Sequence, residues 1–484
     1  MDDMDARAEH EHAAGWYGRT AVAPRTWPAL AFDLDVDVCV VGGGFAGLTA
    51  AFEVARRGWS VALLEAGRIA SEASGRNLGF VIPGFQQDIE SIVERCGLDH
   101  AKVLWSLSED GVEYVRNTIA QTNMPGVDPV DGWLDVSKFD TGDEMIEVIA
   151  LLGQEFGVTV EGWTAEHVRE VLRSEHYFHA LHFPRAFHIH PLNYAFGLAA
   201  AAEAAGVRIF EGTPALTLDP AGVRKRITTP SGRVRANHIV LAANTRLGGV
   251  APDLAHTVLP ITTYVAVTEP LGERLQEAVA YRGAVSDSHS SDHHYRIVGG
   301  DRLMWSGGST TWQGNPQRYG PWLKQTIEQT YPQLGPVEIA DVWAGTMGFA
   351  VHRMPQIGEV QPGVWIASAF AGQGLNTASM AGVLLARAIV ENDDAWRLFL
   401  PYDLVWAGGA LGRAVRQTTS WWRRQRLALA ARGARRREAS VRAATAAEAR
   451  QIALQEKARA ALSALPDEVP SRAGVDVMQH DARQ

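Results

Sequence analysis

The segment from residue 36 to residue 65, VDVCVVGGGFAGLTAAFEVARRGWSVALLE, constrains the fold more than any other part of the chain. A β-branched run, a glycine turn, a helical pattern and a second β-branched run together predict a βαβ unit. Its glycines fit GxGxxG, a pattern that allows a tight turn, close approach of a diphosphate to the backbone, and close packing of helix on strand. The N–H groups at the start of the helix then face an anion, with the helix dipole behind them. The glycines of this pattern are Gly42, Gly44 and Gly47.

An acidic residue stands where a dinucleotide-binding unit needs one. Glu65 ends the second predicted strand, where its carboxylate can accept hydrogen bonds from an unphosphorylated ribose. This unit alone fits either NAD or FAD. The segment that starts at Ala66 favours FAD, because small and hydrogen-bonding residues follow where a nicotinamide domain would proceed to its next helix and strand. These residues include Ser74, Gly75, Arg76, Asn77 and Gly79.

Composition and cysteine content indicate a globular intracellular protein. Of the 484 residues, 46% are hydrophobic and 21% are charged, which excludes a disordered or collagen-like chain. The two cysteines, Cys39 and Cys96, lie in different patterns, so we expect no disulfide and a reducing compartment. The acidic opening lacks the order of a secretory signal, and no apolar run approaches the ~18 residues of a spanning helix. We therefore expect a cytoplasmic protein.

The charge is distributed unevenly along the chain. The net charge is −10, yet residues 421–465 contain 11 Lys and Arg against 3 Asp and Glu. This stretch is rich in alanine and arginine and is predicted to be helical. Tryptophans beside arginines suggest binding to an anionic membrane surface or to a protein partner, and no specific nucleic acid is predicted. The alternative is a solvated helix packed on its own acidic body.

Several further blocks follow the first unit in a recognisable order, from about Val36 to Ile389. They are VVGGGFAGL with LLEAGRI, EASGRN, HIHPLNYAFGLAAAAEAAGVRIFEGTPAL, IVLAANTRLG with LPITTYVAVTEPLGE, VWAGTMGFAVHRMPQIGEV, and FAGQGLNTASMAGVLLARAI. With them the chain resembles the glycine oxidase/D-amino-acid oxidase family of FAD-dependent amine oxidoreductases, and within it the gamma-glutamylputrescine oxidase-like enzymes. Two departures bear on the substrate. Leu78 replaces a second glycine of the family, and His352 and Arg353 stand where an acidic residue is common.

The resemblance implies an α/β fold with an α+β cap. A Rossmann-type FAD-binding domain of the glutathione reductase/D-amino-acid oxidase type would carry a mixed-sheet substrate cap domain and a helical C-terminal extension. The FAD-binding domain is expected at 30–105, 185–250 and 341–400. The cap is expected at 106–184 and 251–340, and the extension, which is basic, at 401–484.

The resemblance also implies FAD, held without a covalent bond, because no residue here matches the covalent attachment sites of some relatives. In the second strong element, a strand, a glycine loop and a helix to about Val390, the helix start would face the flavin N1/C2 carbonyl edge and stabilise negative charge there. A glycine-rich turn without a ligand is the alternative. The predicted cofactor-binding residues are Gly42, Gly44, Phe45, Ala46, Gly47, Glu65, Ala66, Ser74, Gly75, Arg76, Asn77, Leu78, Pro214, Ala215, Ala243, Asn244, Gly372, Gln373, Gly374, Leu375 and Asn376.

The chemistry expected of such a site is oxidation of a primary or secondary amine, either a polyamine or an amino-acid derivative. Hydride would move from the carbon next to nitrogen to flavin N5, and water would hydrolyse the imine. O2 or a protein or quinone acceptor would take the electrons. The predicted catalytic residues are Arg296, Tyr295, His294, Arg353, His352 and Asn77.

Strand alternation places His294 and Arg296 on one face and Tyr295 on the other, so only one set can face the ligand. Arg296 or Arg353 could clamp a substrate carboxylate, or could be an ordinary ion-paired arginine. No metal is predicted, because HIH at 188–190 and DHH at 292–294 lack the spacing of a zinc motif.

Two other functions stay open from the sequence. One is a flavin dehydrogenase that oxidises a hydroxy acid or other non-amine and passes electrons to a membrane or protein acceptor. The other is a non-catalytic FAD-binding subunit of a larger assembly. A substrate of the dehydrogenase would reduce its flavin, whereas no substrate would reduce the flavin of a non-catalytic subunit.

Overall fold

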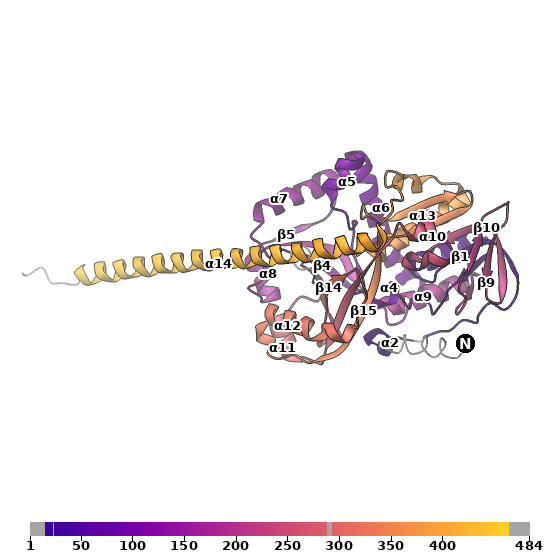
Figure 1. Cartoon of the computed structure of the whole chain (residues 1–484). Coiled ribbons are helices and arrows are strands. Elements are labelled where there is room, and N and C mark those ends of the chain that lie inside the picture. The colour runs from indigo at the N-terminus through magenta and orange to yellow at the C-terminus, as the bar shows by residue number, and fades with distance from the viewer. Residues whose placement is uncertain (1–14, 23, 288–292, 464–484) are drawn as a thin grey trace, which may run out of the picture. The chain divides into compact units, whose positions relative to one another are not determined.

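The computed structural model describes residues 15–22, 24–287 and 293–463. The acidic opening at 1–14, and Asp292 of the DHH run, lie outside the described residues. The chain divides into two compact units after Ala431. The first unit is built on two β-sheets with helices packed against them (Figure 1).

The first sheet has parallel strands at its centre, in the order β16-β17-β10-β1-β2-β7. Its central strands are apolar on both faces, as expected for a parallel sheet covered on both sides. Val38 and Val40 point into one apolar cluster, and Cys39 and Val41 into another. Its described strands are β1 (Leu34–Val41), β2 (Val61–Leu64), β7 (Arg208–Phe210), β8 (Thr217–Asp219), β9 (Lys225–Thr229), β10 (Gly232–Leu241), β16 (Gln356–Gln361) and β17 (Val364–Ser368).

The second sheet is mixed and mostly antiparallel, in the order β15-β11-β14-β13-β12-β4-β6-β3, with β5 paired to β6. One of its faces packs toward the first sheet and the other carries its own apolar cluster. Its described strands are β3 (Phe80–Val81), β4 (Val130–Val136), β5 (Glu161–Trp163), β6 (Ala180–His188), β11 (Leu259–Thr268), β12 (Ala284–Ser286), β13 (His294–Val298), β14 (Arg302–Thr310) and β15 (Ile339–Phe349).

The helices that matter most for the site are those that follow the strands of the first sheet. α3 packs on α13 and on α9, and α6 packs on α13. The described α-helices are α2 (Trp16–Thr20), α3 (Phe45–Arg56), α4 (Ala73–Arg76), α5 (Ile89–Cys96), α6 (Leu98–Thr122), α7 (Gly142–Ala150), α8 (Ala165–Leu172), α9 (Pro191–Ala204), α10 (Pro252–Ala255), α11 (Glu273–Ala278), α12 (Gly320–Thr330), α13 (Gly374–Glu391) and α14 (Gly409–Ser463).

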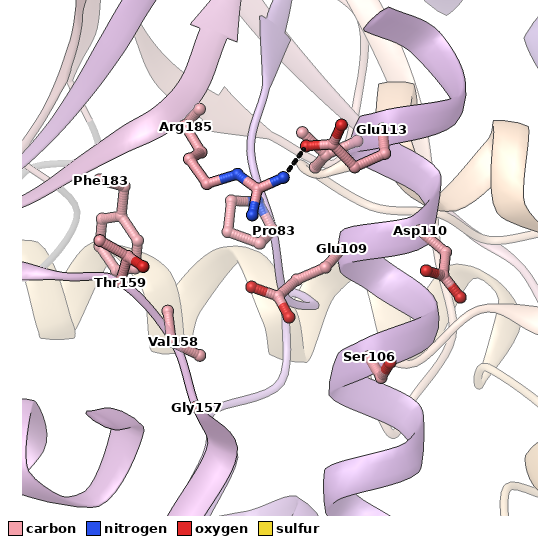
Figure 2. Close-up of a pocket in the computed structure, with 12 residues that line it drawn as sticks. Pro83, Ser106, Glu109, Asp110, Glu113, Gly157, Val158, Thr159, Phe183 and Arg185 are labelled. Atoms are coloured by element: carbon pink, nitrogen blue, oxygen red, sulfur yellow. Dashed lines mark hydrogen bonds and ion pairs between the residues drawn. The ribbon is translucent and has the colours of Figure 1, made fainter. Parts of the chain in front are cut away.

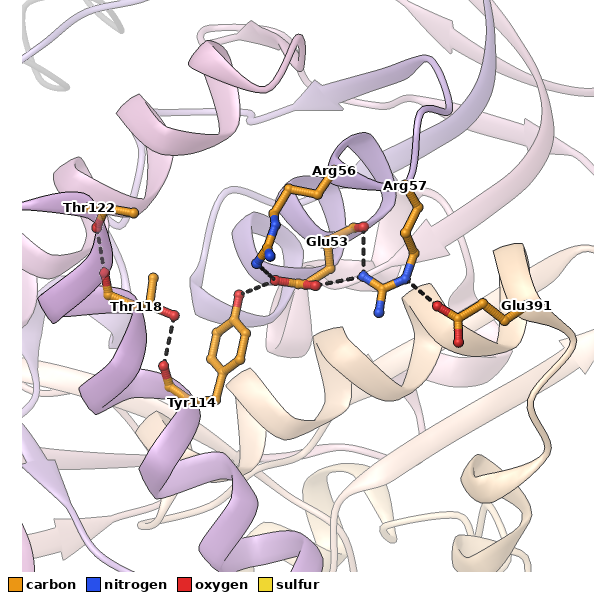
Figure 3. A network of polar contacts seen from close by, with 7 residues as sticks. All are labelled: Glu53, Arg56, Arg57, Tyr114, Thr118, Thr122 and Glu391. Atoms are coloured by element: carbon orange, nitrogen blue, oxygen red, sulfur yellow. Dashed lines mark hydrogen bonds and ion pairs between the residues drawn. The ribbon is translucent and has the colours of Figure 1, made fainter.

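A buried carboxylate ties three of these helices together (Figure 3). Glu53 on α3 accepts hydrogen bonds from Tyr114 Oη on α6 at 2.9 Å and from the Arg57 guanidinium at 2.6 Å. Arg57 in turn contacts Glu391, the last residue of α13, at 2.6 Å. Because a buried carboxylate is tolerated only when it is paired, these bonds hold α6 and α13 against the helix that follows the first turn.

The predicted fold class is confirmed. β9 and β10 form a hairpin around Ser231 and Gly232, and β13 and β14 form another around Gly299 and Gly300. β15 lies mostly within 341–400, which was expected in the FAD-binding domain, yet it pairs with β11 in the second sheet. β15 lies in the second sheet because it forms antiparallel backbone pairs along the full length of β11. The tail forms one helix, α14.

Candidate functional site

The first glycine turn joins β1 to α3 through very close backbone contacts. Gly42 has a φ of +112°, and a Cβ there would lie 2.7 Å from Ala242 O. A Cβ on Gly47 would lie 2.0 Å from Gly42 O, so only glycine lets the helix start this close to the strand. Phe45, the first helical residue, donates its N–H to Ser74 Oγ at 3.1 Å. The turn therefore has the backbone shape that a diphosphate needs.

Four neighbouring parallel strands end at the same edge of the first sheet. In the order β17, β10, β1 and β2, their carboxyl ends carry most of the predicted cofactor residues. Ligands of open α/β sheets bind outside such carboxyl ends. β7 adds the segment before Pro214 and Ala215, because Thr213 donates its N–H to Glu65 O at 2.8 Å. The structure brings together here Gly42, Gly44, Phe45, Ala46, Gly47, Glu65, Ala66, Pro214, Ala215, Ala243, Asn244, Gly372, Gln373, Gly374, Leu375 and Asn376.

Glu65 is oriented by two backbone groups. Its Oε2 accepts the Gly43 N–H at 2.7 Å and its Oε1 accepts the Gly67 N–H at 2.8 Å. Burial raises the pKa of this carboxyl above its ordinary value, and the two N–H groups oppose that rise. Each oxygen keeps a further lone pair, so the side chain fits the two hydroxyls of a ribose.

The segment after β2 is held by side-chain bonds to its own backbone. Asn77 Nδ2 donates to Ala73 O at 2.9 Å and to Ser74 O at 2.8 Å, and Asn77 Oδ1 accepts the Gly79 N–H at 2.7 Å. Asn77 thus shapes the loop that carries Leu78, and its amide is occupied there. Arg76 offers its carbonyl to the Trp343 indole N–H at 2.9 Å, which ties this loop to β15.

The second turn, between β17 and α13, leaves acceptors unused. Gly372 donates its N–H to Gln86 Oε1 at 3.2 Å, and Asn244 Oδ1 accepts the Ala369 N–H at 3.2 Å. Among the described residues, Gln373 Oε1 and Asn376 Oδ1 are buried without a hydrogen-bond partner. Buried acceptors normally find donors, so a ligand carrying N–H or O–H groups fits this turn. The residues present therefore fit a flavin dinucleotide.

A buried arginine lies on the face of the second sheet that packs toward these turns. Arg296 is 5% exposed, and its guanidinium donates to His188 Nδ1 at 2.7 Å and to Tyr17 Oη at 3.0 Å. Its Nε has no partner, and within the described part of the chain no carboxylate pairs with it. Tyr17 also packs edge-on against Trp343, with ring centroids 5.6 Å apart, which links Arg296 to the loop at Arg76.

The partners of Arg296 are electrically neutral. His188 donates its Nε2–H to Arg282 O at 3.0 Å, and burial together with the Arg296 charge lowers the pKa of His188 to about 3. The same causes lower the pKa of His190, the N-cap of α9, to about 4. Burial raises the pKa of Tyr17. Sequence reasoning considered both histidines but missed Tyr17, because nothing in its local pattern marks it.

The alternation predicted for β13 is borne out by its register and partners. His294 shares the face of Arg296, with Nδ1 2.9 Å from Ser286 Oγ and its ring 6.3 Å from that of Phe80. Tyr295 points the other way and is fully buried, with its hydroxyl 2.6 Å from Tyr331 Oη. It belongs to the apolar cluster of the far face. Tyr295 is therefore placed away from the cofactor turns.

The structure does not bring His352 and Arg353 to Arg296. His352 follows β15, donates through Nε2 to Asp403 O at 3.2 Å and packs against Tyr402. Arg353 is in the left-handed region with φ of +59°, in the turn closed by its N–H to Ala350 O. Both side chains belong to the turn between β15 and β16.

A separate cavity lies between α6 and β6 (Figure 2). Its volume is about 250 Å³, and it contains none of the predicted site residues. Three acids of α6 reach it, and one of them, Glu113, pairs with Arg185 at 2.7 Å. Burial raises the pKa of Glu109 and of Asp110. These three acids, Glu109, Asp110 and Glu113, are also close together in the sequence.

The described residues contain neither a cluster of metal ligands nor a helix that could span a membrane. Over the ranges that the structure describes, no three His, Cys, Asp or Glu side chains gather as metal ligands would. Within the same ranges, every helix is too short or too polar to cross a lipid bilayer.

The neutral histidines predict an acid-sensitive fold. In the unfolded chain a histidine has its ordinary pKa of about 6.5, whereas the pKa of His188 in the folded protein is about 3. Between about pH 6.5 and about pH 3 the unfolded state therefore binds more protons than the folded state. The free energy of unfolding is unaffected by His188 above about pH 6.5 and falls as the pH is lowered through this range. His188→Gln keeps an acceptor for Arg296 but does not titrate. Between about pH 7 and about pH 5, wild type should lose about 2 kcal/mol more unfolding free energy than this variant.

Urea unfolding at the two pH values measures this difference. The matched control is His167→Gln, because His167 is exposed on α8 and contacts neither Arg296 nor its partners. Equal acid sensitivity of wild type and His188→Gln would contradict the assignment of a neutral, buried imidazole.

Known proteins are similar to this chain in sequence and in fold. Residues 37–388 match the family model DAO, FAD dependent oxidoreductase. The chain is 32% identical to gamma-glutamylputrescine oxidoreductase of Escherichia coli (strain K12), covering 80% of this chain and 92% of that protein. It is 28% identical to the probable oxidoreductase OrdL of Haemophilus influenzae, over 81% of this chain and 91% of that protein.

Solved structures agree at the level of the fold. Glycine oxidase from Geobacillus kaustophilus superposes with a TM-score of 0.65 at 18% identity, covering 77% of this chain and 99% of that chain. L-proline dehydrogenase from P. horikoshii gives 0.64 at 18% identity, with 76% and 98% covered. With the family model spanning most of the chain and the two glycine turns at one sheet edge, the chain belongs to the DAO family of FAD-dependent oxidoreductases, and FAD is its cofactor.

Proposed function

We propose that this protein oxidises a primary or secondary amine, either a polyamine or an amino-acid derivative, to an imine that water then hydrolyses. The name of the relative at 32% identity, gamma-glutamylputrescine oxidoreductase, supports an amine substrate. FAD, when bound, supplies the hydride acceptor, and the amine nitrogen loses a proton as the carbon–nitrogen double bond forms. O2 or a protein or quinone acceptor then takes the electrons.

The observation that carries this proposal is the uncompensated charge of Arg296. A buried cation whose described partners are all neutral disfavours a second cation nearby. An amine bound on this face would therefore bind as the free base, and only the free base has the nitrogen lone pair that drives loss of hydride. In this role Arg296 does not react with the substrate. Its charge favours the neutral, unprotonated form of the bound amine.

The other residues of this face would orient the substrate and exclude water. His294 is half-buried on the strand that carries Arg296, with Phe80 beside it. Its imidazole is oriented by Ser286 and can hydrogen-bond to a substrate nitrogen or carbonyl. Asn77 acts indirectly, by fixing the loop that carries Leu78.

We propose further that FAD is held without a covalent bond. Glu65 would bind the ribose, the first turn the diphosphate, and the start of α13 the flavin end. Cys39 lies inside β1, where burial raises the pKa of its thiol to about 12, so it supplies no thiolate. Acid precipitation should leave the yellow chromophore in the supernatant, and colour in the pellet would contradict this.

Anaerobic reduction of the bound flavin tests the proposed function. A panel of polyamines, N-acylated diamines and amino acids is mixed with holoenzyme in a stopped-flow spectrometer, with hydroxy acids as the comparison. At least one amine should bleach the flavin absorbance at a rate that depends on its concentration. Bleaching by hydroxy acids alone, or by nothing, would overturn the proposal. Admitting air afterwards and measuring peroxide identifies the electron acceptor.

The role of Arg296 predicts a shift in pH dependence. Removing its charge in Arg296→Met should raise the pKa of the bound amine, so the rising limb of kcat should move to higher pH by about 1 unit. The control is Arg302→Met on the neighbouring strand, because Arg302 already pairs with Glu269 at 3.1 Å. If the rising limb of kcat lay at the same pH in Arg296→Met as in wild type, or shifted equally in both variants, Arg296 would not have this role.

A further inference from the structure

Helix α14 carries a row of exposed apolar residues. Leu411 is 71% exposed, Val415 56%, Trp422 62% and Leu429 65%. At about 100° per residue, these four side chains lie within about 40° of one another around the helix axis. We name this row the apolar stripe. Single exposed apolar residues are ordinary, but an aligned row that includes a tryptophan marks an interaction surface.

Another side of the first turns of α14 contacts residues of the second sheet and of the segment after β14. Gln417 Oε1 accepts the Thr311 N–H at 2.9 Å, and Arg413 O accepts the Thr311 hydroxyl at 3.0 Å. Arg416 lies over the ring of Phe349, 5.9 Å from its centroid. At about 100° per residue, these three residues lie between about 100° and 180° around the helix axis from the residues of the stripe. The contacts with Thr311 and Phe349 therefore lie on another side of the helix from the stripe.

Charge accompanies the stripe. α14 contains thirteen Arg and Lys and three Glu, although the whole chain has a net charge of −10. Arg426, which is exposed, lies next to the stripe around the axis. Before the helix, Trp406 is 64% exposed and its ring lies beside Gly409, so aromatic surface continues at the start of the helix. Apolar side chains flanked by arginines are typical of helices that lie in a membrane interface.

A second copy of the helix is a poor partner for the stripe. A coiled-coil seam needs two apolar positions in every heptad, and here only the positions of Val415, Trp422 and Leu429 repeat at seven residues. The positions four residues after Val415 and Trp422 are Thr419 and Arg426. Two such helices side by side would also repel through their arginines.

We propose that α14 docks this flavoenzyme onto a lipid surface that carries anionic headgroups, with the apolar stripe inserted at the interface and the arginines among the phosphates. The bilayer supplies apolar depth for Trp422 and Leu429 and negative charge for the arginines, a combination that neither water nor nucleic acid provides. The helix lies on the surface and does not cross it, in keeping with its polarity. This inference is independent of the substrate proposed above.

Vesicle co-sedimentation of full-length holoenzyme tests the docking. The probes are vesicles of phosphatidylcholine alone and of phosphatidylcholine mixed with phosphatidylglycerol. Wild type should sediment with the anionic vesicles, and added salt should weaken the binding. The double variant Trp422→Ala/Leu429→Ala should bind the anionic vesicles at least about tenfold more weakly than wild type, because each truncation removes an apolar side chain from the interface.

The matched control truncates the same kinds of side chain elsewhere. Trp312 and Ile146 are 49% and 66% exposed and lie outside α14, so Trp312→Ala/Ile146→Ala should bind as wild type does. Retained flavin absorbance and helical circular dichroism confirm that each variant is folded. Absence of wild-type binding to anionic vesicles, or equal weakening in the control, would overturn the proposal. So would a smaller particle by light scattering in the stripe variant, which would assign the stripe to self-association.

Discussion

The structure depends on one backbone contact at the first turn. Gly47, in the first turn of α3, lies so close to Gly42 O that a Cβ on it would be only 2.0 Å from that oxygen. This contact aims the N–H groups at the start of α3 at the space beyond β1 and fixes α3 against the sheet. The helices α9 and α13 then pack on α3, and Glu53 secures its far end. The position of the cofactor end of the sheet follows from this contact.

The sequence was most informative where the relevant contacts are local. Strand, turn and helix from residue 36 to residue 65 are close in the chain, so their pattern predicted both the turn and the place of Glu65. The same holds for the second turn, which precedes α13. That both turns meet at one edge follows from parallel pairing of β1, β10 and β17, which a βαβ pattern and the family resemblance together imply.

The surroundings of Arg296 could not be predicted in this way. Its partners His188 and Tyr17 are 108 and 279 residues away, and they meet it only through strand pairing in the second sheet and the placement of α2. Alternation predicted which face Arg296 occupies, but not which other side chains reach that face. Asn77 shows the opposite error, since a polar residue that looked available for chemistry is occupied by its own loop.

Positive charge is used in two different ways in this molecule. At Arg296 the charge is buried among neutral groups, where the low local dielectric makes it effective over several ångströms and raises the cost of any second cation. On α14 the charges are numerous and lie on an exposed helix, where each contributes little alone and the sum acts on a charged surface. In the proposed roles, the buried charge favours the neutral form of the substrate amine, and the exposed charges bring the protein to an anionic surface. The acidic remainder of the chain would be repelled by such a surface, and the arginines of α14 would oppose that repulsion. The apolar stripe lies on another side of the helix from its contacts with Thr311 and Phe349, so those contacts and insertion of the stripe do not compete.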